Sequence, residues 1–161
     1  MKASAGFTHV LATLALVLFS GVAAAQQRPS YGGQLTLDEA KKIAAGSAAE
    51  AKRNNWNVAI ALVDNHGMLI YYEMLDDTQT SSANIALEKA RTAAMFRRPS
   101  RAFEEVVSKG RVAVLGLPGA TPVTGGLPIY VNGKIVGAVG VSGVTSEQDE
   151  QVAQAGLNAL K

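Results

Sequence analysis

The sequence predicts an α+β domain in which about five antiparallel strands form one sheet with helices packed on it. Two pairs of apolar segments, 58–63 with 68–74 and 129–131 with 134–141, are each joined by a short turn, which is the pattern of β-hairpins. Segments with helical periodicity precede, separate and follow the two hairpins. Because hairpins build antiparallel sheets, we expect the helices to cover the sheet rather than to alternate with its strands.

The first helix is predicted to begin at Thr36, because Thr36 and Glu39 form a Thr-x-x-Glu capping box. Small and apolar residues then recur at helical spacing as far as Ala51. The uninterrupted apolar stretch 58–63 predicts a strand that is covered on both faces. Asp64-Asn65-His66-Gly67 supplies the turn into the second strand, with Gly67 free to adopt positive φ.

Two helices are expected in the middle of the chain. The first runs from about Ala83 to Phe96 and must end before Pro99, since proline disfavours helix in the residue ahead of it. Ser100 is expected to cap a short helix, and Gly110 to end it in a left-handed conformation.

The last third of the chain is rich in glycine. A Pro/Gly/Thr loop at 117–128 leads to the second hairpin, which turns at Asn132-Gly133, a strong two-residue hairpin signal. The stretch between the third helix and this hairpin leaves room for the fifth strand. Ser146 with Asp149 is expected to start a final helix.

The first 25 residues are predicted to be a cleavable signal peptide. Lys2 gives the positive start, residues 10–19 the apolar run and Ala23-Ala24-Ala25 the cleavage site. The apolar run is shorter than the roughly 20 residues that span a bilayer, so a retained anchor is the minor alternative. We therefore expect a flexible leader at 26–34, one domain at 35–161 and a periplasmic or secreted location without a stable membrane anchor.

Composition excludes several classes of function. The chain has no cysteine, which rules out disulfides, thiolate nucleophiles and Cys-ligated metal sites. A formal net charge of +2 and a short basic run at 97–101 do not make a nucleic-acid-binding face. Removal of the signal would leave His66 as the single imidazole, and Ser142 lies in a near miss of G-x-S-x-G, so a Ser-His-Asp triad is not expected.

Four motifs in the chain are similar to those of a known family. In order they are Val63-Asp64-x-x-Gly67, Ser82-x-x-Ile85-Ala86-x-x-Lys89-Ala90, Gly125-Gly126-x-Pro128-Ile129 and Gly137-Ala138-x-Gly140-Val141-Ser142-Gly143. Their order and spacing resemble the GlcG–HbpS family, which includes extracellular haem-binding proteins and the C-terminal domain of PduO-type adenosyltransferases. The resemblance implies a profilin-like α/β/α sandwich, usually oligomeric, and haem or iron binding for some members.

Lys89 is the first candidate for contact with a ligand. It is the one charge on the helical face that carries Ser82, Ile85, Ala86 and Phe96. A buried ammonium group needs a carboxylate or a ligand anion close by. Lys89 is therefore expected either to bind a ligand, or to pair with Asp64 or Asp76, or to reach water along its stem.

The glycines of the last third have two interpretations. Gly125 and Gly126 could present backbone donors to a carboxylate or phosphate, or could simply give a sharp entry into the strand at Ile129. Gly137, Gly140 and Gly143 do not form a dinucleotide fingerprint. We interpret these three as sites where another backbone or a helix comes close to the strand.

Haem ligation has several candidates. His66 is the expected iron ligand if it is more than an exposed turn residue, and Tyr71, Tyr72 and three methionines are further candidates, Met68, Met74 and Met95. Tyr71 and Tyr72 are adjacent, so only one can face a given side of the sheet. Arg97 and Arg98 are expected either to clamp the propionates or to be a solvated helix end.

We therefore predict an exported small-molecule-binding protein, with haem as the leading ligand. One alternative is an enzyme or accessory protein that acts on a small organic acid through Lys89 and the Gly125-Gly126 loop. The other is a non-catalytic homo-oligomeric interaction module.

Overall fold

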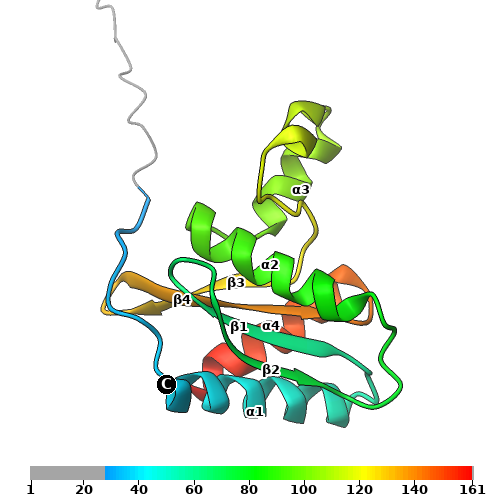
Figure 1. Cartoon of the computed structure of the whole chain (residues 1–161). Helices are drawn as coiled ribbons and strands as arrows, with labels where there is room; N and C mark the ends of the chain where they lie inside the picture. Colours follow the sequence, from blue (N-terminus) through cyan, green and yellow to red (C-terminus); the bar gives the residue numbers. More distant parts are fainter. Residues whose placement is uncertain (1–27, 161) are drawn as a thin grey trace, which may run out of the picture.

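Helices cover both faces of a single sheet in a computed structural model, which describes residues 28–160 (Figure 1). The elements are α1 (Leu37–Arg53), β1 (Ala59–Asp64), β2 (Leu69–Met74), α2 (Ser82–Phe96), α3 (Arg101–Ser108), the 3₁₀ helix η1 (Val112–Gly116), β3 (Gly126–Val131), β4 (Lys134–Ser142) and α4 (Ser146–Ala159). α2 lies on one face of the sheet, and α1 and α4 lie on the other. The predicted signal peptide, 1–25, lies outside the described residues.

The sheet has four strands in the order β2-β1-β4-β3, and every strand pair is antiparallel. β1 and β4 are central, and β1 is buried along its whole length, as its unbroken apolar sequence predicts. Pro128 lies in the edge strand β3, where its missing N–H costs no ladder bond to a further strand. The second hairpin turns at Asn132 and Gly133, which both have positive φ.

The α+β class and the sandwich architecture are confirmed, but the sheet has four strands rather than five. Within the described residues, the stretch expected to supply the fifth strand folds instead as η1 and an irregular loop. Gly116, Pro118 and Pro122 interrupt this stretch, and proline cannot donate to a ladder. Of the residues before α1 that the structure describes, Tyr31 forms a single parallel bridge with Ile135 of β4.

Capping boxes start the first and the last helix. The Thr36–Glu39 box is present at α1, as predicted. At α4 the cap is one residue earlier than expected, because Thr145 and Gln148 form the box instead of Ser146 and Asp149. The Asp149 carboxylate is engaged elsewhere.

α2 rests directly on glycines of the sheet. A Cβ atom at Gly140 would overlap the carbonyl oxygen of Ala86, and one at Gly126 would overlap the carbonyl oxygen of Lys89. The prediction that strand glycines admit a helix is confirmed at Gly140. Ala90 also faces this contact, so small residues on both sides bring the helix backbone onto the strands.

A buried ion pair joins α2 to α4 across the edge of the sheet. The Nζ of Lys89 lies 2.7 Å from Oδ2 of Asp149 and donates a second bond to the carbonyl of Val141, at 3.0 Å. Oδ1 of Asp149 accepts from the backbone N–H of Val144, at 3.1 Å. The expected pairing of Lys89 with Asp64 or Asp76 is wrong, because the Asp64 carboxylate instead caps the β1–β2 turn and Asp76 is exposed.

Replacement of Gly140 by alanine should destabilise the fold strongly. The added methyl group meets helix backbone, which cannot rotate away, so we expect a loss of about 1–3 kcal/mol or more in the free energy of unfolding. Gly33→Ala is the matched control, because a Cβ atom there has no neighbour within 4 Å. Chemical denaturation of both variants tests this, and equal stabilities would contradict the packing argument.

Lys89→Met should cost about 3–5 kcal/mol, because it leaves the Asp149 carboxylate buried without a cation. Burial already raises the pKa of Asp149, and loss of the ammonium raises it further. The folded variant then binds a proton that the unfolded chain releases, so its stability deficit should shrink as pH falls and widen as pH rises.

Thermal unfolding of Lys89→Met between pH 5 and pH 8 measures this dependence. Lys52→Met removes an exposed lysine and serves as the control. The double variant with Asp149→Asn should recover part of the loss. A deficit that does not change with pH would show that Asp149 is not the group left uncompensated.

Candidate functional site

The seven residues predicted from sequence to bind a ligand occupy three different places. Lys89, Gly125 and Gly126 are buried where α2 meets β3 and α4. His66, Tyr72 and Arg97 lie on the side of the sheet that α2 covers, or at the end of that helix. Tyr71 packs against the core on the opposite side, formed with α1 and α4.

The buried group is closed to ligands by its own contacts. The N–H of Gly126 donates to the Ser100 hydroxyl, at 2.9 Å, so it is not free to bind an anion. A Cβ atom at Gly125 would lie 3.0 Å from Nζ of Lys89, and Lys89 is only 1% exposed. The predicted organic-acid site at these residues would require the interface to open.

The β1–β2 turn presents His66 to solvent. Oδ1 of Asp64 accepts from the backbone N–H groups of His66 and Met68, at 2.8 and 2.9 Å, and Gly67 completes the turn with φ of 84°. The His66 side chain is 72% exposed, with Nδ1 4.0 Å from Oδ2 of Asp64. This distance is longer than a hydrogen bond, so the imidazole is near the Asp64 carboxylate without being bonded to it.

The turn is tied to the C-terminal half of α2. Nε of Arg91 donates to the Gly67 carbonyl, at 3.1 Å, and the Met95 side chain packs against Gly67. The Tyr31 hydroxyl donates to the Met95 carbonyl, at 2.9 Å, and so holds the segment before α1 against the same end of the helix. The backbone that carries His66 is therefore held against α2, with the Met95 thioether beside the neighbouring Gly67.

Apolar side chains extend from the turn along the edge strand. Leu69 and Tyr72 pair with Val63 and Ala61, which face α2, so both side chains lie on the α2 side of the sheet. α2 packs on β1, β3 and β4 but does not cover β2. Leu69 and Tyr72 therefore remain exposed. We call the exposed set the hairpin–α2 surface; it consists of His66, Met68, Leu69, Tyr72 and Met95.

The two tyrosines differ as candidate iron ligands. Tyr71 and Tyr72 face opposite sides of the sheet, and the hydroxyl of Tyr71 lies 3.5 Å from the Glu73 carboxylate. Burial raises the pKa of Tyr72, which disfavours the phenolate that would bind iron. His66 is consequently the best placed of the three.

Arg97, at the end of α2, already makes contacts within the chain. The helix ends at Phe96, as predicted, and Arg97 follows it in a left-handed conformation that the sequence patterns did not predict. Its guanidinium lies over the Tyr31 ring and donates to the carbonyl of Pro29, at 3.3 Å. Through Tyr31, Arg97 is placed at the same end of α2 as Met95.

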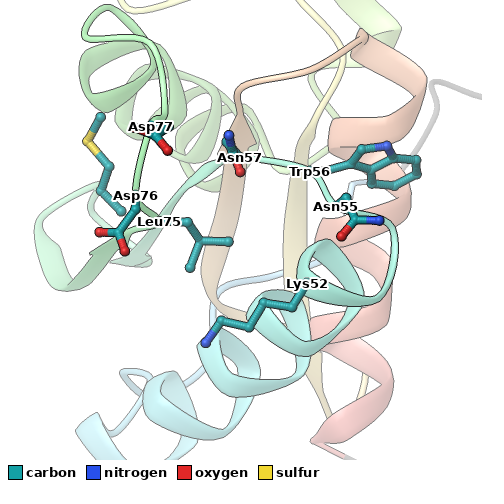
Figure 2. Close-up of a pocket in the computed structure, with 8 residues that line it drawn as sticks. Lys52, Asn55, Trp56, Asn57, Leu75, Asp76 and Asp77 are labelled. Carbon is teal, nitrogen blue, oxygen red and sulfur yellow. The ribbon is translucent and has the colours of Figure 1, made fainter.

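A polar hollow that sequence reasoning missed lies at the other end of the β2 strand. It measures about 380 Å³, and Lys52, Trp56, Asn57, Asp76 and Asp77 are among its lining residues. Figure 2 shows the Trp56 ring turned away from Asp76 and toward the red C-terminal helix. The lysine and the two aspartates in this lining suit a small polar molecule. They do not suit haem, whose ring needs apolar surface. Only the cluster of asparagines at 54–57 could have drawn attention to it.

Residues 28–160 contain neither a cluster of potential metal ligands nor a membrane-spanning helix. No group of three or more His, Asp or Glu side chains in this range is placed to hold a metal ion. No helix in the described part of the chain is long and apolar enough to cross a membrane.

Comparison with known proteins identifies the family. The family model for haem degrading protein HbpS-like matches residues 35–158. Protein GlcG of Escherichia coli K12 is 45% identical over 108 residues, which cover 67% of this chain and 81% of GlcG.

Solved structures agree with this match. A double mutant of HbpS from Streptomyces reticuli superposes with a TM-score of 0.75 at 25% identity, covering 98% of this chain and 99% of HbpS. A structure of PduOC in complex with haem superposes with a TM-score of 0.72 at 23% identity, covering 78% and 94% of the two chains. The chain therefore belongs to the HbpS-like family.

Proposed function

We propose that this protein binds haem on the hairpin–α2 surface, with His66 as the ligand to iron. The observation that carries the proposal is an exposed imidazole on a well-defined turn that adjoins exposed apolar side chains. Haem needs both features, an axial donor for the iron and apolar contact for the ring. The family is named for haem, and PduOC, which shares the fold, was solved in complex with haem.

The residues of the surface fit haem in three respects. Met68, Leu69 and Met95 offer flexible apolar contact to the porphyrin face. Asp64 lies where it can orient the imidazole through Nδ1, as outer-shell carboxylates do at metal sites. Arg97 carries N–H groups beyond the one bonded to Pro29, and these are available for a propionate. Bound haem would supply a redox-active iron with Lewis-acid character.

The location is part of the proposal. The signal-like segment 1–25 supports a periplasmic or secreted protein, in which an open surface site would meet haem from outside the cell. The hairpin–α2 surface is exposed rather than enclosed, which suits uptake and transfer of the ligand.

Titration with hemin tests the proposal. The purified protein should show saturable binding with a shifted Soret band, and His66→Ala should weaken binding at least about tenfold and move the band, as expected when an iron ligand is lost. Tyr71→Phe is the matched control, because Tyr71 faces the other side of the sheet.

Two other outcomes would correct or overturn the proposal of haem binding through His66. If Tyr72→Phe moves the band and His66→Ala does not, the surface is right and the assigned ligand is wrong. Binding that does not saturate, or that is indifferent to all three substitutions, would mean that hemin only adheres to apolar surface.

A second role, assembly with further copies of this chain, is favoured by a different observation. α3 and η1 form an arm, residues 101–116, that projects from the layered body (Figure 1). Val112 and Leu115 on the arm are 63% and 61% exposed, and Leu117 follows them. Exposed apolar residues grouped in this way are typical of protein interfaces. We propose that the arm is a contact between subunits of a homo-oligomer.

Leu115→Glu should weaken such an assembly, because it places a charge at the centre of the apolar group. Size-exclusion chromatography with light scattering should show a smaller particle at equal protein concentration. Lys109→Glu, also exposed on the arm, is the control for charge alone. Identical particle sizes for Leu115→Glu and the unmodified protein would contradict the assignment of the interface.

A further inference from the structure

The polar hollow at the end of β2 lies between two fixed walls. One wall is the end of α1 and the segment after it, where the Trp56 N–H donates to the Ala51 carbonyl, at 2.9 Å, and the Trp56 ring packs against the core. The other wall is the end of β2, where the Leu75 N–H donates to the Val58 carbonyl, at 3.0 Å. The Thr78 hydroxyl donates to the Leu75 carbonyl, at 2.7 Å, and closes the turn beyond it. The hollow is therefore formed before any ligand arrives, which lowers the cost of ordering it on binding.

Three charged side chains line the hollow, and they come from both walls. Lys52 lies in the last turn of α1, and Asp76 and Asp77 follow β2. In Figure 2 the Lys52 side chain extends from the cyan helix toward the side of the hollow on which Asp76 lies. None of the ion pairs within residues 28–160 includes any of these three groups. A cation on one wall and two anions on the other thus line the same space without pairing with one another.

Neighbouring charges do not compensate these groups. Glu50 and Arg53, the other two charges near the end of α1, pair with each other. On β2, the Glu73 carboxylate is approached by the Tyr71 hydroxyl, at 3.5 Å, and forms no ion pair with Lys52 among the described residues. The C-terminal end of a helix also carries partial negative charge. The hollow therefore favours a positive group near its aspartates and accepts a negative group at its lysine.

We propose that this hollow binds a small zwitterion, a molecule with one carboxylate and one ammonium group, such as a free amino acid. Lys52 donates to the carboxylate of the ligand, and Asp76 and Asp77 accept from its ammonium group. The amide side chains of Asn55 and Asn57 line the same hollow and offer neutral donors and acceptors. A volume of about 380 Å³ is sufficient for a molecule of this size.

Other small ligands match these charges less well. A simple carboxylate could pair with Lys52 but would be repelled by Asp76 and Asp77, and a simple amine would be repelled by Lys52. A neutral sugar would leave all three charged groups without a partner of opposite sign. The hollow lies at the opposite end of β2 from His66, so the site is independent of haem binding.

Calorimetric titration of the purified protein with glycine, β-alanine and γ-aminobutyrate tests the site. These three amino acids differ in the spacing of their charges, and acetate and methylamine are the ligands of single charge. At least one amino acid should bind saturably, about tenfold or more tightly than either single-charge ligand. Lys52→Met, and the double variant Asp76→Asn with Asp77→Asn, should each weaken this binding about tenfold or more. Asparagine tolerates the left-handed backbone of Asp77, whose φ is 59°.

Lys41→Met is the matched control, because Lys41 is an exposed lysine on α1 that does not line the hollow. Lys52, Asp76 and Asp77 are also exposed, so thermal unfolding of their variants should match that of the unmodified protein. The proposal is overturned if no amino acid binds saturably, if Lys52→Met binds as tightly as the unmodified protein, or if Lys41→Met loses as much affinity as Lys52→Met. Acetate or methylamine binding as tightly as the best amino acid would overturn the zwitterion as the ligand class.

Discussion

At Gly126 and Gly140 the backbone of α2 lies on the sheet with no space for a Cβ atom between them. Such close contact removes any freedom for the helix to slide, because protein interiors are packed too densely to absorb a shift. The Lys89–Asp149 pair then joins this helix to α4 at the same place. Small residues and one buried charge pair together fix the position of α2 relative to every other element.

The position of α2 also determines which strand remains uncovered. The helix rests over β4, β1 and β3, so on that face the edge strand β2 keeps Leu69 and Tyr72 open to solvent. The same helix ends beside the β1–β2 turn, where Arg91 and Met95 contact Gly67. The exposed apolar strip and the position of the turn that carries His66 are therefore consequences of how α2 is packed.

Local sequence patterns were sufficient for most of the fold. The Thr36–Glu39 box, the turn at Asn132-Gly133 and the glycine at 110 each act within a few residues, and the structure has all three. Pairs of residues that lie far apart in the sequence could not be predicted from local patterns. Asp149 is 60 residues from Lys89, and its position in a first helical turn looks like a capping role, which Gln148 in fact performs.

For the candidate site, local sequence patterns predicted single residues but not their arrangement. The sequence indicated His66, Tyr72 and Arg97 separately, yet the contacts that relate them depend on the three-dimensional packing of Tyr31, Gly67 and Met95.

The buried Lys89 shows why ligand binding is better sought at the exposed hairpin–α2 surface. A free carboxylate that competed for Lys89 would have to displace Asp149, whose other oxygen is held by the N–H of Val144. Asp149 is part of the same chain, so it binds Lys89 without the loss of translational freedom that a ligand must meet. The displaced carboxylate would also stay buried without its partner, at a further cost of several kcal/mol.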